Sequence, residues 1–232
     1  MHKIIIYISL TFLLAVSISF ADILEKYGYA REITNIVMRD GISLATDVYR
    51  PKKEGKYPCV LARTPYNRQG RQAMIEPFFA ESLVVVVQDC RGRFDSEGEF
   101  FPFVNERKDG LETVKWVRNQ NWSNGKVAGF AGSYNGYAQL AISDVLDFAV
   151  PDVACANIRE IVYPYGFFTP KTAYSWGFAM DGFSYPEKLK ESYKILPLSA
   201  ASFKTYGRTN KFIIIFCVLF LISNYLHLTP ET

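Results

Sequence analysis

The chain has 232 residues, of which 49% are hydrophobic and 21% charged, and its formal net charge is +3. This composition excludes a disordered chain and supplies enough apolar residues for the core of one domain, or of one domain and part of another. Lys and Arg alternate with Asp and Glu without a basic tract, so we expect no nucleic-acid partner.

The first 21 residues predict an export signal. His2 and Lys3 begin it, an apolar stretch follows at residues 4–16, and Ser19-Phe20-Ala21 forms a small-x-small cleavage site. We expect cleavage after Ala21 and export of the remainder to the periplasm or the extracellular space. An uncleaved anchor is the alternative, although the apolar stretch is short for a membrane span of about 20 residues.

Residues 22–162 predict the core of an α/β domain. Asp40-Gly41, between two β-rich runs, indicates a hairpin. The valines from Val84 to Val87 suit a strand buried on both faces, as in a parallel sheet. The elements expected after the hairpin are, in chain order, a strand at 56–66, a helix at 72–82 kinked by Pro77, a strand at 83–93, a helix at 106–119, a turn at 122–125, a strand at 126–133, a helix at 134–146 and a strand at 153–158. This alternation predicts a doubly wound, mostly parallel sheet covered by helices.

Residues 163–211 predict the start of a cap insertion beside the sheet. The segment begins with aromatic and Pro/Gly-rich sequence at 163–183 and continues with a short charged helix at 186–194. A cap in this position would roof an active site at the carboxyl ends of the strands. The aromatic residues either line a pocket for an acyl group or form the core of the cap, and both interpretations stay open.

The sequence GFAGSYNGYAQ places Ser133 between small residues, where a strand is expected to give way to a helix. A sharp turn of this kind needs small neighbours, which Gly132 and Gly136 supply, and it exposes the serine hydroxyl above the sheet. The strict G-x-S-x-G pattern is absent, because Ala131 and Asn135 occupy the outer positions. Taken alone, the segment is equally typical of a phosphate-binding loop or of a plain connection.

Several segments together resemble the Xaa-Pro dipeptidyl-peptidase and cocaine-esterase-like serine hydrolases, from about Ile33 to Arg208. They are RTPYNR at 63–68, QDCRGRFDSEGEF at 88–100, the NWSNGKV turn and GSYNGYAQ. The family elbow has the pattern G-x-S-Y-x-G, from which only Ala131 departs. The resemblance implies an α/β-hydrolase fold with a helical cap, a small ester, amide or peptide substrate, and no metal or organic cofactor.

The resemblance also implies three catalytic groups. Ser133 would be the nucleophile, the backbone N–H of Tyr134 one oxyanion donor, and the hydroxyl of Tyr66 the second donor. Outside the family, a tyrosine at a strand end is more typical of a packed side chain with its hydroxyl in water. The charged loop from Asp89 to Glu97 contains turn-forming Gly and Ser residues, so we expect its charges to pair locally and expect no metal site.

The four cysteines show neither the spacing of metal ligands nor a dense disulfide framework. Three of them lie in apolar runs that predict strands. We therefore expect small buried side chains at Cys59, Cys90, Cys155 and Cys217.

The general base for such a site is not evident in the sequence. The family uses a histidine oriented by an aspartate, both downstream of the cap. Here residues 212–232 are a mainly apolar tail, and His227 lies in it without a recognisable aspartate partner. We interpret the tail as the product of a frame change or truncation near Lys211, with a membrane anchor or a buried terminal element as alternatives.

These features predict a serine hydrolase that cleaves ester or amide bonds, including those of Xaa-Pro peptides, through an acyl-enzyme at Ser133. The expected absence of the triad aspartate and histidine leaves two alternatives. One is a catalytically incomplete fragment, associated with a membrane if the tail is an anchor. The other is a binding module that holds an anionic or acyl ligand with the oxyanion donors.

Overall fold

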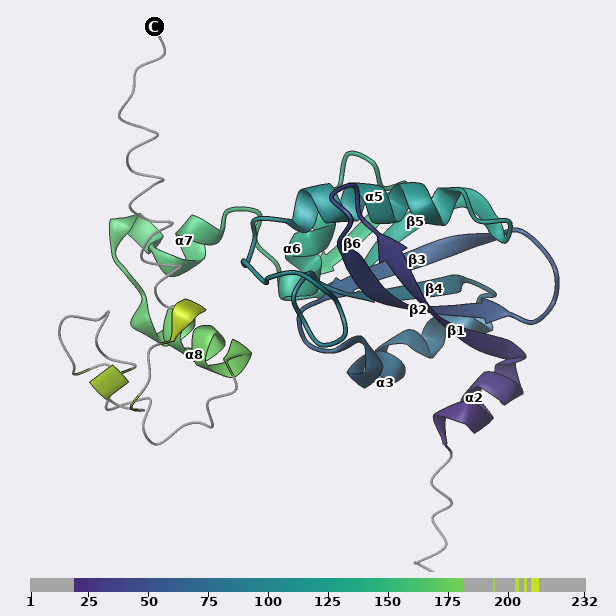
Figure 1. The fold of residues 1–232 in the computed structure, drawn as a ribbon, viewed down its shortest axis with the longest axis horizontal. Coiled ribbons are helices and arrows are strands. Elements are labelled where there is room, and N and C mark those ends of the chain that lie inside the picture. The colour runs from purple at the N-terminus through teal and green to yellow at the C-terminus, as the bar shows by residue number, and fades with distance from the viewer. Residues whose placement is uncertain (1–18, 182–193, 195–202, 205–206, 208–209, 213–232) are drawn as a thin grey trace, which may run out of the picture.

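The structure is a computed structural model that describes residues 19–181, 194, 203–204, 207 and 210–212 (Figure 1). The predicted signal up to residue 18, most of the charged helix predicted at 186–194 and the tail beyond Phe212 lie outside the described residues. Within the described part of the chain, no helix has the length and apolar character needed to cross a membrane.

Six strands form one sheet. They are β1 (Tyr29–Val37), β2 (Ser43–Pro51), β3 (Tyr57–Thr64), β4 (Val84–Asp89), β5 (Ser123–Gly132) and β6 (Phe148–Asp152). Their order is β1-β2-β4-β3-β5-β6; β1 and β2 pair antiparallel, β2 pairs antiparallel with β4, and β4, β3, β5 and β6 are parallel. The mostly parallel α/β sheet expected from the sequence is therefore confirmed.

The hairpin between β1 and β2 is also confirmed. Its turn lies at Asp40-Gly41, where the N–H of Gly41 donates to the carbonyl oxygen of Met38 at 2.9 Å. Gly41 has a φ of +84°, a conformation that a residue with a side chain adopts only at a cost. The glycine therefore sets both the position of the turn and the register of the two strands.

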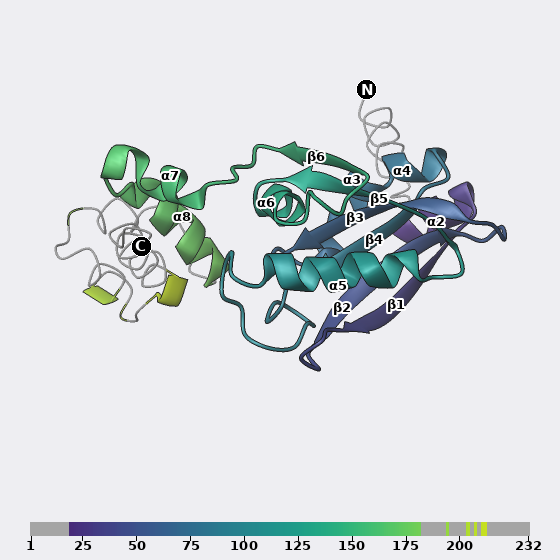
Figure 2. The ribbon, with the colours of Figure 1, turned by 90° about the horizontal axis from the view of Figure 1, so that it is seen from above.

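Helices cover both faces of the sheet. The helices are α2 (Phe20–Tyr27), α3 (Gln72–Ile75), α4 (Pro77–Ala80), α5 (Glu106–Arg118), α6 (Tyr134–Leu140), α7 (Ile158–Val162) and α8 (Pro170–Met180), with 3₁₀ turns η1 (Arg68–Arg71) and η2 (Pro164–Gly166). Of these, α7 and α8 lie beyond one end of the sheet (Figures 1 and 2). Figures 1 and 2 show α5 and α6 on one face of the sheet and α2, α3 and α4 on the opposite face. Pro77 begins α4, and the helix predicted at 72–82 is accordingly two short helices.

The valines of β4 divide the core between the two faces. Val84 and Val86 pack in the cluster that contains Val117 of α5, whereas Val85 and Val87 pack in the cluster that contains Phe79 of α4. Successive side chains of a strand point to opposite faces, so a run of four valines supplies both cores. Each buried valine contributes about 1.5 kcal/mol or more to the free energy of unfolding.

Four predicted boundaries are wrong. The strand predicted at 83–93 is β4, which ends at Asp89. The strand predicted at 153–158 is instead β6, which ends at Asp152; it contains Pro151, which a strand at the edge of the described sheet tolerates. The turn predicted at 122–125 belongs to β5, where Gly125 has a φ of +87° and the pairing with β3 shifts register. The helix predicted at 134–146 ends at Leu140 and continues as turns.

The segment predicted as the signal cleavage site lies at the start of α2. Ser19 caps this helix, since its hydroxyl accepts from the N–H of Asp22 at 3.2 Å and the Asp22 carboxylate accepts from the N–H of Ser19 at 3.0 Å. Phe20 packs against Phe79 and Tyr49, with ring centroids 6.3 and 5.6 Å away. The start of α2 is thus part of the packing on this face of the sheet.

Candidate active site

Ser133 occupies a sharp turn between β5 and α6. Its φ of +58° and ψ of −131° are strained for a residue with a side chain. A Cβ atom on Gly132 would lie 2.8 Å from the carbonyl oxygen of Asp152, and one on Gly136 would lie 2.5 Å from the Cβ of Ala154. Both positions therefore require glycine, as the small residues around Ser133 predict, and the hydroxyl of Ser133 is exposed.

Ala131 also has a backbone conformation that favours glycine. Its φ is +106°, and its carbonyl oxygen accepts a hydrogen bond from the side-chain amide of Gln139 at 2.7 Å. Glycine reaches positive φ without a steric cost, whereas alanine does not. The one departure from the family pattern thus lies at a strained position that the Gln139 contact helps to hold.

The hydroxyl of Tyr66 lies 3.2 Å from Oγ of Ser133. Tyr66 follows β3, and its backbone N–H donates to the hydroxyl of Thr64 at 3.1 Å. Because β3 and β5 are parallel neighbours, the loops after them meet at the same edge of the sheet. The topology brings together the two side chains that the sequence suggested, 67 residues apart in the chain.

The third predicted residue, Tyr134, is the first residue of α6, so its N–H has no partner within the helix. The Tyr134 hydroxyl donates to the Glu106 carboxylate at 2.5 Å and accepts from the N–H of Phe103 at 2.9 Å. Burial, followed by the negative charge of Glu106, raises the pKa of Tyr134 well above its usual value. The phenol stays protonated and anchors the start of α6 next to Ser133.

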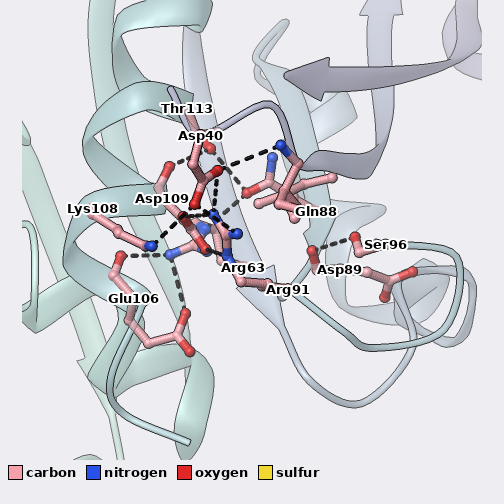
Figure 3. A network of polar contacts seen from close by, with 12 residues as sticks. Asp40, Arg63, Gln88, Asp89, Arg91, Ser96, Glu106, Lys108, Asp109 and Thr113 are labelled. Atoms are coloured by element: carbon pink, nitrogen blue, oxygen red, sulfur yellow. Dashed lines mark hydrogen bonds and ion pairs between the residues drawn. The ribbon is translucent and has the colours of Figure 1, made fainter. Parts of the chain in front are cut away.

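Glu106, which binds the Tyr134 hydroxyl, also belongs to a buried ionic network. Figure 3 shows this network around Arg63, Glu106 and Asp109. Arg63, at the end of β3, lies 3.2 Å from the Glu106 carboxylate and donates to the side chain of Gln88 at 2.8 Å. Burial opposes the charge of Arg63, yet the carboxylates of Glu106 and Asp109 outweigh it and raise the pKa of the guanidinium. These contacts join α5 both to the strand that leads to Tyr66 and to the helix that follows Ser133.

The charged loop from Asp89 to Glu97, which the structure describes in full, forms ion pairs, as expected, but with partners outside the loop and not with its own residues. Arg68 binds Asp89 at 2.6 Å and Asp95 at 2.7 Å, and Arg91 binds Asp109 at 2.6 Å. Among the residues that the structure describes, no group of three or more His, Cys, Asp and Glu side chains is arranged to hold a metal ion.

A cavity of about 150 Å³ opens beside Ser133. Its lining includes three residues with hydroxyl groups, Ser133, Tyr66 and Thr172, and most of the remaining lining is apolar or aromatic. Side chains of α7 and α8 form one wall, and the loops after β3, β5 and β6 form the other. A concave, mostly apolar site with a few convergent polar groups is typical of a binding pocket for a small molecule.

The family model for X-Pro dipeptidyl-peptidase (S15 family) matches residues 40–198. The chain belongs to the S15 family. It is 38% identical over 133 residues to the cocaine esterase of Rhodococcus sp. (strain MB1 Bresler), a match that covers 53% of this chain and 23% of that protein. This chain therefore aligns with about a quarter of that relative's length.

A solved aminopeptidase from the marine sediment archaeon Thaumarchaeota archaeon has the same fold as this S15 chain. The TM-score is 0.68 at 23% sequence identity, and the superposition covers 88% of this chain and 42% of the aminopeptidase. The α/β-hydrolase fold expected from the sequence is confirmed.

The roles of the cap aromatic residues of this S15 chain stayed open at the level of sequence, and Phe103 was not identified there as a pocket residue. Trp176 and Phe103 line the cavity, whereas Tyr174 and Phe178 are fully buried in the cap. The aromatic residues of the cap thus serve both of the roles left open. Thr172, Ala173 and Trp176 share a face of α8 by helical spacing, a signal obscured by the density of aromatic residues around them.

The cysteine prediction is right for two positions. Cys59 and Cys90 are buried and unpaired, and burial raises the pKa of each thiol. The prediction is wrong for Cys155, which is half-buried, lies outside any strand and lines the pocket of this S15 chain. Cys217 lies outside the described residues.

The part of the chain that the structure describes contains no histidine. His2 and His227 both lie outside it. The described residues of this S15 chain therefore present a serine and two candidate oxyanion donors, and they place no imidazole beside them.

Proposed function

We propose that this chain carries the acylation site of a serine hydrolase that cleaves ester or amide bonds through an acyl-enzyme at Ser133. The observation that carries the proposal is the 3.2 Å distance between Oγ of Ser133 and the Tyr66 hydroxyl, on a strained turn exposed to a pocket. Membership of the S15 family supports the same chemistry.

In the proposed reaction, Oγ of Ser133 attacks the carbonyl carbon of the substrate and gives its proton to a base. The carbonyl oxygen becomes an oxyanion that accepts hydrogen bonds from the Tyr66 hydroxyl and the Tyr134 N–H. The bond to the leaving alcohol or amine breaks, the leaving group takes a proton, and water later hydrolyses the acyl-serine. The base comes from outside the described residues, because these contain no histidine.

The pocket supports neutral, apolar acyl groups as the substrate class. Its wall includes Phe103, Tyr137, Ile158 and Trp176. The similar protein from Rhodococcus is named a cocaine esterase, and the family is named for X-Pro dipeptidyl-peptidase. We propose ester hydrolysis first and peptide cleavage as the alternative. Residues 1–21 support export of the protein as a further part of the proposal.

The experiment that tests this function is incubation of the full chain with p-nitrophenyl benzoate. We expect release of at least one equivalent of p-nitrophenol and a benzoyl group on the peptide that contains Ser133. Ser133→Ala should abolish both, whereas Ser143→Ala, at an exposed serine in the turns after α6, should abolish neither. Acylation that survives in Ser133→Ala would place the nucleophile elsewhere.

Tyr66→Phe separates the proposed oxyanion donor from the nucleophile. The variant keeps the ring and its packing against Tyr134 but loses the hydroxyl. We expect the acylation rate to fall about 10²-fold or more, the usual effect of removing one oxyanion donor. An unchanged rate of p-nitrophenol release would return Tyr66 to a packing role.

A further inference from the structure

The indole of Trp176, in cap helix α8, contacts the hydroxyl of Tyr66. Its Nε1 lies 3.0 Å from the tyrosine oxygen. An indole N–H can only donate, whereas a tyrosine hydroxyl has one proton to give and can also accept. The Tyr66 oxygen is therefore the acceptor in this bond, and its own proton is left for a different partner.

Oγ of Ser133 lies within reach of that proton, at 3.2 Å, in a contact in which either hydroxyl can donate. The bond from Trp176 occupies one acceptor direction of the tyrosine oxygen and leaves the Tyr66 proton available to the nucleophile. The carbonyl oxygen of a substrate attacked by Ser133 would arrive on this same side. A donor that already points to the place where charge develops needs no reorientation during the reaction.

The ring of Trp176 is held on several sides. It stacks on Tyr134 at 5.8 Å with an interplanar angle of 2°, and it lies 5.7 Å from Phe103 and 6.0 Å from Phe212. Tyr134 is also the residue whose N–H is the other proposed oxyanion donor. One indole thus contacts both residues of the proposed oxyanion hole.

Arg93 holds the two elements together. Its Nε donates to the carbonyl oxygen of Pro65, next to Tyr66, at 2.9 Å, and its Nη1 donates to the carbonyl oxygen of Met180, the last residue of α8, at 3.1 Å. A planar guanidinium with donors in fixed directions suits a bridge between two backbone segments. The loop of Tyr66 and the helix of Trp176 are therefore joined by a contact that involves neither side chain.

We propose that Trp176 is a positioning residue, whose indole N–H orients the Tyr66 hydroxyl toward Ser133 for oxyanion binding. This inference rests on the proposed function and deepens it. The cap then has a second task besides lining the pocket, because it supplies the group that aims a donor in the core.

An NMR spectrum of the full chain tests the contact without any need for activity. The chain has three tryptophans, so labelling with [¹⁵N]tryptophan gives three indole N–H signals, and loss of one in Trp176→Phe assigns it. Tyr66→Phe should shift the Trp176 signal upfield and leave the signals of Trp116 and Trp122 in place. Tyr137→Phe, at another hydroxyl of the pocket lining, should leave all three in place. If the chemical shift of the Trp176 indole N–H is the same in Tyr66→Phe as in the unaltered chain, the inference is overturned.

The affinity for phenylboronic acid tests whether Trp176 acts through Tyr66. Oγ of Ser133 gives its proton to the base and a lone pair to boron, and the tetrahedral boronate that forms carries an oxygen in the place of the oxyanion. Trp176→Phe and Tyr66→Phe should each weaken binding about threefold to tenfold, the effect of one hydrogen bond. The double variant should bind no more weakly than Tyr66→Phe alone, and Trp116→Phe should bind like the unaltered chain.

The NMR spectrum and the boronic acid affinity together distinguish failure of this inference from failure of the proposed function. Losses that multiply in the double variant overturn the positioning role, because Trp176 then acts independently of Tyr66. If the unaltered chain fails to bind phenylboronic acid, the proposed acylation site is contradicted. The indole spectrum still decides whether Trp176 holds the Tyr66 hydroxyl.

Discussion

The two walls of the pocket are built in different ways. The sheet wall carries Ser133 and Tyr66 and is backed by buried ion pairs such as Arg63 with Glu106. The cap wall, from α7 and α8, presents mainly apolar side chains to the pocket. Outside the pocket the cap segment exposes aromatic residues, with Tyr165 100% and Phe167 77% exposed.

This difference separates the proposed reacting groups, on the sheet wall, from the side chains that line the substrate pocket, on the cap wall. The proposed reacting groups lie where glycine contacts, a strained turn and charged hydrogen bonds leave the backbone few alternatives. The side chains that line the substrate pocket on the cap wall are held by apolar packing, which tolerates the exchange of one side chain for another of similar volume. Trp176 differs from the apolar side chains of the cap wall, because its N–H makes a directional hydrogen bond.

The largest effect is expected from Arg63→Met on the sheet side. The substitution leaves the buried carboxylate of Glu106 without its cation, which costs about 3–5 kcal/mol in the free energy of unfolding. Arg107→Met, which removes an exposed ion pair with Asp144, should cost about 1 kcal/mol or less. Guanidinium denaturation measures both, and equal losses would erase the contrast between buried and exposed pairs.

Gly136→Ala tests the close packing behind the turn of Ser133 on the sheet wall. The new Cβ would lie 2.5 Å from the Cβ of Ala154, so the segment after β6 or the helix α6 must move. We expect a loss of about 1–3 kcal/mol in stability, the usual cost of overpacking, together with slower acylation at Ser133.

Gly70→Ala is the matched control for Gly136→Ala. A Cβ at Gly70 meets no atom within 4 Å, so this variant should keep both stability and acylation rate. Equal behaviour of the two variants would show that the frame of the elbow is not crowded.

The smallest effect is expected at the rim of the ionic network and depends on pH. The hydrogen bond from Arg91, more than that from Lys108, lowers the pKa of Asp40 to about 2. A lowered pKa means that folding favours the ionised form, so this stabilisation is complete above the unfolded pKa of about 4 and disappears as pH falls toward 2. The difference in melting temperature between the unaltered chain and Asp40→Asn should therefore shrink over this range. A difference that is constant from pH 6 to 2 contradicts the assignment.

The sequence allowed much of the sheet wall to be predicted. Gly132 and Gly136 marked the turn of Ser133, and Asp40-Gly41 marked the hairpin. At each of these positions the local backbone excludes or disfavours a side chain, so the glycine is visible in the sequence itself. The pairing of Tyr66 with Ser133 came from the resemblance to a family. Local patterns could not give it, because it depends on β3 and β5 being neighbours in the sheet.

The rest of the site depends on contacts between segments far apart in the chain. Arg63 and Glu106 are 43 residues apart, and nothing in either local sequence shows that they are buried together. Trp176 lies in a stretch so rich in aromatic residues that its contact with Tyr66 has no local signal. The position of β6 was predicted wrongly because its sequence is not typical of a strand: it contains Pro151, and its apolar residues Phe148 and Val150 are exposed at the edge of the sheet.

The measurement that tests the central claim most directly is the site of labelling by a serine-directed fluorophosphonate on the full chain. The reagent forms a bond from phosphorus to the attacking oxygen and releases fluoride. Fragmentation of the labelled peptide should place the phosphonyl group on Ser133, and Ser133→Ala should remain unlabelled under the same conditions. A label on any other residue, or one that persists in Ser133→Ala, contradicts the assignment of Ser133 as the nucleophile.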